Sequence, residues 1–227
     1  MMFEWDSPDA AKDWDAHRGQ HLPTRAEQHE VLLELLAAAG IGDKAVLDLG
    51  VGSGLVAEAV LDRLPAAHLV GIDCSAAMLE IGRNRLHRFG SRVDLYQCDL
   101  AEVALLDLPR LQYGAIVSVQ TMHHLTDEAK AATFAWAASI VEPGGLVVVV
   151  DRVRVPEHLF HDWAVLWRLI DPETPETYVE HLAELARAGD QPALLQYQLG
   201  WLEAAGLHTT CLHLYGNRAV LVGRKPA

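Results

Sequence analysis

Short apolar segments alternate with amphipathic ones through the middle of the chain, and this alternation restricts the fold more than any other feature. From Lys44 onward, the segments expected to form strands are Ala45–Leu49, His68–Ile72, Val93–Gln97, Ala115–Val119 and Gly145–Asp151. Helical patterns separate them at Leu55–Arg63, Ala76–Phe89 and Asp127–Val141. Such alternation is typical of a parallel sheet covered by helices on both faces. We therefore expect an α/β fold with a doubly wound, mostly parallel sheet.

The C-terminal part follows a different pattern. After a helical segment at Ala193–Ala205, the runs LHTTCLHLY and RAVLVGRK are separated only by Gly216 and Asn217, a composition suited to a tight hairpin turn. This hairpin is expected to bring the sheet to seven strands, one of them antiparallel. Residues 152–190 lack a convincing strand and carry tryptophan, leucine and histidine at helical spacing, which predicts a helical insert after the fifth strand.

A chain of 227 residues can bury a substantial core, so one domain over residues 1–227 is expected. We divide it into an N-terminal helical cap at 1–40, a core at 41–151, the insert at 152–190, and a final helix with the hairpin at 191–227. Within the cap, Thr24 is predicted to be an N-cap, with Glu27 at capping-box spacing.

Charge and composition limit the partners. The chain has 18 basic and 31 acidic residues and a net charge of −13, so it repels phosphate backbones, and no nucleic-acid partner is expected. The aliphatic run Leu146 to Val150 is far too short to span a bilayer, and the start lacks the pattern of a secretory signal. Three cysteines without CxxC spacing favour neither a disulfide framework nor a zinc cluster. We expect a cytoplasmic protein without a membrane or metal partner.

The segment VLDLGVGSG, residues 46–54, places glycine at positions 50, 52 and 54, where the first strand meets the first helix. Glycine tolerates positive φ and lets a ligand lie directly on the backbone. The N-terminus of the following helix favours a carboxylate or phosphate. The dinucleotide pattern G-x-G-x-x-G fails because Leu55 occupies its third glycine position, and no Walker lysine follows.

The segment DLGVGSG resembles the D/E-x-G-x-G-x-G motif of class I S-adenosylmethionine-dependent methyltransferases. The similarity continues in the family's order through VGIDCSAAML (70–79), QCDLAEV (97–103), GAIVSVQTMHHL (114–125) and VEPGGLVVVVD (141–151). It covers roughly residues 44 to 151, and the terminal hairpin extends it. The resemblance implies a Rossmann-like fold, S-adenosylmethionine as cofactor, and an activity like that of the small-molecule methyltransferases.

Two acids follow neighbouring strands. Asp73 ends the second strand, where a carboxylate can accept both hydrogens of a ribose diol. Asp99 resembles the family's contact with the adenine amino group, although it would also serve as a helix or turn cap. By the same resemblance, Asp48 orients the methionine end of the cofactor; alternatively it satisfies loop amides. The full set of expected cofactor-binding residues is Asp48, Gly50, Gly52, Gly54, Asp73, Cys74, Met78, Asp99, Leu100 and Gln120.

Methyl transfer is an in-line displacement that depends mainly on alignment, and it needs a base only if the nucleophile loses a proton. The candidates for catalytic roles are His123 and His124 after the fourth strand and Asp151 at the end of the fifth. Packing is the alternative for the histidines, and an ion pair with Arg152 or Arg154 is the alternative for Asp151. The fourth strand lacks the [DN]-P-P-[FYW] pattern, which argues against methylation of DNA adenine.

Two segments flank the core, the insert and the N-terminal stretch. Four apolar residues of the insert are expected to cover the acceptor pocket: Trp163, Trp167, Tyr178 and Leu182. His158, His161 and Asp162 lie close together in the sequence, but a metal site is not expected there, because H-x-x-H is not the i, i+4 spacing of the zincin motif and no third ligand is identifiable. The N-terminal stretch with Trp5, Trp14 and Arg18 resembles the helix that closes the cofactor side in relatives.

The resulting prediction is a methyltransferase that acts on oxygen, nitrogen or carbon of a small molecule. Two alternatives stay open: transfer to a tRNA or protein, and a non-catalytic module that binds S-adenosylmethionine to regulate a partner. Nicotinamide-dependent chemistry is disfavoured by Leu55.

Overall fold

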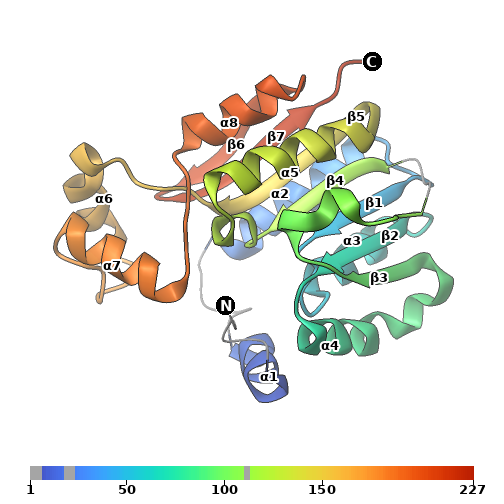
Figure 1. The fold of residues 1–227 in the computed structure, drawn as a ribbon, viewed down its shortest axis with the longest axis horizontal. Coiled ribbons are helices and arrows are strands. Elements are labelled where there is room, and N and C mark those ends of the chain that lie inside the picture. The colour runs from blue at the N-terminus through green and yellow to red at the C-terminus, as the bar shows by residue number, and fades with distance from the viewer. Residues whose placement is uncertain (1–6, 18–23, 110–112) are drawn as a thin grey trace.

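The computed structural model describes residues 7–17, 24–109 and 113–227, and its centre is one seven-stranded sheet (Figure 1). The strand order is β3-β2-β1-β4-β5-β7-β6. The strands are β1 Ala45–Leu49, β2 His68–Asp73, β3 Val93–Gln97, β4 Tyr113–Val119, β5 Val141–Arg152, β6 His208–Tyr215 and β7 Arg218–Arg224. Strand β7 runs opposite to the other six, so its pairs with β5 and β6 are antiparallel and the remaining pairs are parallel. The predicted doubly wound α/β sheet with an antiparallel strand in the C-terminal hairpin is confirmed.

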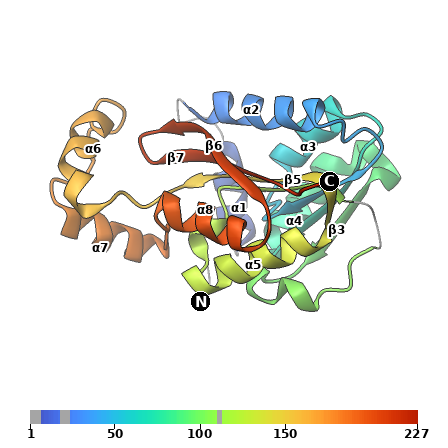
Figure 2. The same ribbon diagram turned by 90° about the horizontal axis from the view of Figure 1, so that it is seen from above.

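Helices cover both faces of the sheet (Figure 2). One face packs against α2 Arg25–Ala38, α3 Leu55–Arg63 and α4 Ala76–Leu86. The other face packs against η3 Leu100–Leu105, α5 Asp127–Ile140 and α8 Leu195–Ala204. Alternate residues of β5 enter the two cores: Leu146 and Val148 lie on the α2 face, whereas Val147 and Val149 lie on the α5 face. Both faces are therefore apolar, which explains the near-continuous hydrophobic strands.

The remaining elements are short. They are α1 Pro8–His17, η2 His87–Arg92, η4 Met122–His124, η5 Glu157–Leu159, α6 Phe160–Trp167 and α7 Tyr178–Ala188. The insert formed by η5, α6 and α7 projects from the sheet beyond the end of β5 (Figures 1 and 2). It has a small apolar core of its own, with Phe160, Trp163 and Trp167 buried together. No helix within the described ranges is long and apolar enough to cross a membrane.

The predicted capping box at Thr24 is wrong. Thr24 does precede α2, but its backbone is helical (φ −88°, ψ −9°) and its side chain makes no capping hydrogen bond. An N-cap side chain reaches the free N–H groups from an extended backbone. Thr177 before α7 has that geometry (φ −121°, ψ 153°) and forms a complete capping box with Glu180.

The sheet order fixes the position of a site. From β1 the chain builds outward to β2 and β3 in one direction, and from β4 to β5 in the other. Ligands of such sheets bind at the carboxyl ends of the strands where the order reverses. The loops after β1, β2, β4 and β5 therefore surround the candidate site.

Candidate functional site

The glycine loop after β1 has the backbone that the sequence predicted. Gly50, Gly52 and Gly54 all have positive φ, at 84°, 53° and 80°. The main-chain N–H groups of Gly50 and Val51 donate to the Ile72 carbonyl at 2.8 and 2.9 Å, which fixes the loop on β2. A Cβ at position 50 would lie 2.1 Å from Thr121 Oγ1, so only glycine fits there.

Asp73 connects the glycine loop to the beginning of α4. Its Oδ2 accepts from the Gly52 N–H, and its Oδ1 accepts from the Ser75 N–H, both at 2.8 Å. An ionised carboxylate has about four acceptor positions, so the two oxygens can accept hydroxyl groups as well. The carboxylate is thereby held in a fixed orientation at the end of β2.

Gly52 lies close to both the Asp73 carboxylate and the Met78 side chain. A Cβ at Gly52 would lie 3.3 Å from the Met78 methyl carbon and 4.0 Å from Asp73 Oδ2. A side chain at position 52 would therefore crowd the methionine beside the carboxylate. Burial, reinforced by Asp73, raises the pKa of Asp48 to about 7. A cationic group bound nearby would favour the ionised form of Asp48, so these residues fit the positively charged nucleoside that the resemblance implies.

The other expected cofactor contacts lie at the ends of β2 and β3. The Cys98 N–H donates to the Asp73 carbonyl at 3.0 Å, which joins the two strand ends. Asp99 is exposed and caps η3, its Oδ1 accepting from the Ala101 N–H at 2.9 Å. Met78 and Leu100 are buried, whereas Cys74 is exposed.

The turn after β4 is strained where it meets the glycine loop. Gln120 has a φ of 55° and is the one non-glycine residue with positive φ within the described ranges. Its N–H donates to the Val150 carbonyl at 2.8 Å, and the next residue, Thr121, contacts Gly50. A backbone in this region costs on the order of 1–3 kcal/mol, and such strain gathers at functional sites.

Two of the candidate catalytic residues, His123 and Asp151, form a buried pair. The His123 N–H donates to Asp151 Oδ2 at 2.9 Å, and the ring Nδ1 lies 2.5 Å from Oδ1. Burial lowers the pKa of His123, so the neutral ring donates from Nδ1. Burial alone would raise the pKa of Asp151, but His123 and Arg152 hold it below its ordinary value.

Asp190 completes this cluster, and the sequence analysis missed it. It follows the C-cap of α7, and its Oδ1 lies 3.6 Å from His123 Nε2 and 3.2 Å from His124 Nδ1. Its Oδ2 contacts the Arg152 guanidinium. This carboxylate comes from the end of the insert, 39 residues after Asp151 in the sequence. No sequence motif surrounds it. The glycine before it, which ends α7, was its only sequence signal.

Among the described residues, one group of potential metal ligands comes within 4.8 Å of one another, namely His123, His124 and Asp190. The Arg152 guanidinium already pairs with this carboxylate, which opposes a divalent cation there. His158, His161 and Asp162 are exposed on the insert.

The N-terminal helix contacts the glycine loop from outside. Asp15 of α1 accepts from the Ser53 hydroxyl at 2.5 Å and from the Arg85 guanidinium at 2.8 Å. Trp5 and Arg18 lie outside the described residues, as does the side chain of Trp14. Asp15 thus connects the N-terminal helix to the glycine loop and to α4.

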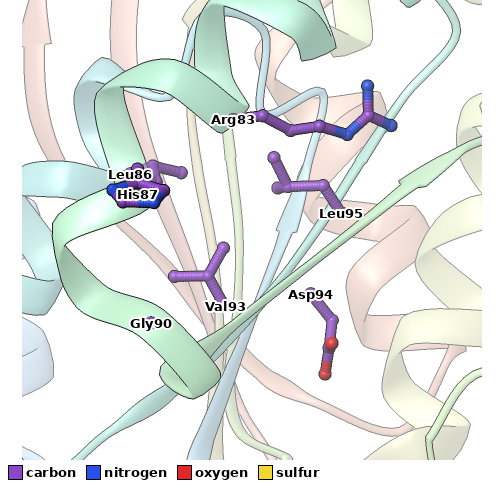
Figure 3. Close-up of a pocket in the computed structure, with 7 residues that line it drawn as sticks. All are labelled: Arg83, Leu86, His87, Gly90, Val93, Asp94 and Leu95. Atoms are coloured by element: carbon purple, nitrogen blue, oxygen red, sulfur yellow. The ribbon is translucent and has the colours of Figure 1, made fainter.

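A surface hollow lies elsewhere, along the amino-terminal half of β3 and the adjoining part of α4 (Figure 3). Its lining is Arg83, Leu86, His87, Gly90, Val93, Asp94 and Leu95. Asp73 and Asp99 lie at the carboxyl ends of β2 and β3, whereas this hollow lies at the amino-terminal half of β3. The hollow is therefore not part of the site described above.

Fold and site together define a nucleoside-binding α/β protein of the methyltransferase type. Residues 46–145 match the family described as "Methyltransferase domain". A trans-aconitate 2-methyltransferase of Methylobacterium nodulans is 30% identical over 216 residues, which cover 92% of this chain and 77% of that protein. A ubiquinone biosynthesis O-methyltransferase of Aromatoleum aromaticum is 32% identical over 109 residues, or 48% of this chain and 44% of the relative.

Solved structures show the same fold at low identity. An O-methyltransferase family protein from Burkholderia thailandensis has a TM-score of 0.65 at 17% identity, covering 97% of this chain and 60% of that one. Magnesium protoporphyrin IX methyltransferase from Synechocystis, with bound SAH, has a TM-score of 0.62 at 15% identity, with 88% and 82% covered. The chain belongs to the class I S-adenosylmethionine-dependent methyltransferases. S-adenosylmethionine is its methyl donor.

Proposed function

We propose that the protein transfers the methyl group of S-adenosylmethionine to a small molecule bound over the carboxyl ends of β4 and β5. One observation carries this proposal: the Asp73 carboxylate is bonded to the glycine loop, and the same loop contacts Thr121, next to the strained Gln120. The net charge of −13 favours a small acceptor over a nucleic acid. The relatives named for trans-aconitate and ubiquinone biosynthesis also support a small acceptor.

In this proposal the ends of β2 and β3 bind the nucleoside. Asp73 accepts the ribose hydroxyls, and Asp99 accepts from the adenine amino group. Met78 and Leu100 form apolar walls for the base, with Cys74 at its edge. Asp48 and Gln120 face the methionine end across the glycines at positions 50, 52 and 54. When bound, S-adenosylmethionine supplies a methyl group on a positively charged sulfur, which is open to in-line displacement.

On the acceptor side, the protein contributes mainly alignment, which can lower the barrier by several kcal/mol. The buried pair of His123 and Asp151 holds the turn after β4 against the end of β5. His124 keeps 19% of its side chain exposed, so it is the residue of this group that can accept a proton from an acceptor hydroxyl or amine.

Methyl-labelled S-adenosylmethionine tests the proposal. The protein is incubated with fractionated cell extract, and labelled products are sorted into small molecules, RNA and protein. Label in a small molecule is expected, and it should be absent when Asp73→Ala replaces the wild-type protein. Label in RNA or protein alone would contradict the small acceptor. Tight cofactor binding without any labelled product would instead indicate the non-catalytic module.

A further inference from the structure

Three arginines meet at the carboxyl edge of the sheet, on the face covered by α2. Arg25 is the first residue of α2, Arg152 is the last residue of β5, and Arg218 is the first residue of β7. Arg152 and Arg218 are direct partners across the two strands. The antiparallel direction of β7 is what brings its first residue to this edge. We call Arg25, Arg152 and Arg218 the arginine cluster.

The guanidinium groups of the arginine cluster act on one another electrostatically. Two carboxylates influence Arg218, those of Asp151 and Asp190, against the two other guanidinium groups. Burial, followed by the charge of Arg152, lowers the pKa of Arg218 to about 10. Burial and Arg152 likewise lower the pKa of Arg25.

Several buried donors in this region have no acceptor. Within the part of the chain that the structure describes, this is true of Nε and Nη1 of Arg218, Nε of Arg152 and the indole Nε1 of Trp163. The indole lies beside the hairpin turn, 3.4 Å from where a Cβ on Gly216 would be. Leaving a buried donor without a partner costs about 1–3 kcal/mol, and more for a charged group. Four such atoms in one region indicate a place for an anion.

We propose that the arginine cluster and the Trp163 indole bind a carboxylate of the methyl acceptor. This inference rests on the proposed function and specifies its substrate class. The neighbouring carboxylates of Asp151 and Asp190 would repel a doubly charged phosphate more strongly than a singly charged carboxylate. Guanidinium groups bind carboxylates through two parallel hydrogen bonds, which also fixes the orientation of the acceptor.

The surroundings specify the rest of the acceptor. The aromatic side chains of Phe160, Trp163 and Trp167 lie in the adjoining insert, with Arg218 over the Trp167 ring at 5.5 Å. They favour an apolar or aromatic body. Strand β5 is two positions from β1, about 10 Å at the usual strand spacing, so a small acceptor can reach from the arginine cluster to the methyl group.

Binding of small acids tests this inference. In the presence of S-adenosylhomocysteine, calorimetry and tryptophan fluorescence measure the affinity of hexanoate, benzoate, cinnamate and 4-hydroxybenzoate, of their amides, and of phenyl phosphate. At least one acid should bind at least tenfold more tightly than its amide. Arg218→Gln should abolish that preference, and Arg218→Lys should keep part of it. The control is Arg224→Gln, on the same strand at the opposite edge, which should leave the preference unchanged.

The outcomes separate the two proposals. If wild-type protein does not bind S-adenosylhomocysteine, the proposed function fails. If it binds and yet every acid and its amide bind equally, only the arginine cluster proposal is overturned. Tighter binding of phenyl phosphate, or equal behaviour of Arg218→Gln and Arg224→Gln, overturns it as well. Thermal unfolding of each variant shows that a lost preference does not come from a lost fold.

Discussion

Arg85 of α4 binds the Asp15 carboxylate of α1 with both ends of its guanidinium group, at 3.1 Å from Nη1 to Oδ1 and 2.8 Å from Nη2 to Oδ2. The same Nη1 donates to the Ser53 main-chain oxygen at 2.6 Å. One cation thus holds the N-terminal helix and the glycine loop together. The two side chains are each 19% exposed, so this pair is less weakened by solvent than a surface ion pair.

Replacing Arg85 should loosen the cofactor loop. In Arg85→Gln, α1 loses its charged partner, and the affinity for S-adenosylhomocysteine should fall several-fold, on the order of 1 kcal/mol. Titration calorimetry measures this. Arg88→Gln removes a nearby arginine that pairs with Glu58 and Asp62 at the surface, and it should bind as wild type does. Equal affinity of both variants would contradict the role given to Arg85.

Removing the Asp73 carboxylate should weaken cofactor binding strongly. Asp73→Ala loses the proposed pair of hydrogen bonds to the ribose and the loop contact at Gly52, for a loss of roughly 2–4 kcal/mol. Asp94→Ala, on the neighbouring strand β3, is the matched control, since Asp94 bonds to His68 instead. An unaltered affinity in Asp73→Ala would remove this residue from the site.

Asp48 should make stability depend on pH. Its pKa rises from 3.8 to about 7 on folding, so between these values the folded state holds a proton that the unfolded state has lost. Wild-type stability from this group is therefore complete below about pH 4 and declines as pH rises to about 7. Asp48→Asn lacks this decline. In urea unfolding, the free energy of unfolding of Asp48→Asn minus that of wild type should increase by roughly 2–3 kcal/mol from pH 5 to pH 8. If the unfolding free energies of wild type and Asp48→Asn change with pH in parallel, the prediction is contradicted.

His123→Ala should destabilise the fold as well as lower turnover. The change leaves the buried Asp151 without its ring partner, which costs about 3 kcal/mol for a buried pair. Affinity for S-adenosylhomocysteine should change little, because the ring faces Asp151 and Asp190 and not the glycine loop. His68→Ala breaks a partly exposed pair with Asp94 and should cost less than about 1 kcal/mol. Urea unfolding measures the loss of stability in both variants, and an equal loss in His123→Ala and His68→Ala would contradict the prediction.

Gly50 and Gly144 provide a test of the close contact at the site. Both have positive φ, at 84° and 78°, so alanine is strained at either position. Only Gly50 is also blocked by Thr121, whereas nothing lies within 4 Å of a Cβ at Gly144. Gly50→Ala should therefore be destabilised by several kcal/mol and Gly144→Ala by about 1 kcal/mol. Similar losses of thermal stability would mean that the contact with Thr121 yields easily.

The sheet was predictable because burial on both faces leaves a local pattern. The expected strands at Ala45–Leu49 and Val93–Gln97 have the observed limits. The glycine loop was predictable for a similar reason, since positive φ at three alternate positions excludes most residues. Both features depend on neighbours in the sequence.

The parts that sequence reasoning missed depend on distant segments. Asp190 reaches His124 from the far end of the insert, and Arg218 meets Arg152 only because two strands pair. A capping box was expected at Thr24, where spacing was right but the backbone was helical. Residue spacing does not reveal backbone dihedrals or the packing of separate elements.

The reversed direction of β7 has a consequence for how this scaffold can diversify. The other six strands end at the edge of the sheet where the candidate site lies, whereas β7 begins there, next to the turn at Gly216. Lengthening or shortening that bend would exchange the group presented there while leaving the nucleoside half untouched. Selectivity for the partner molecule can thus drift separately from donor recognition.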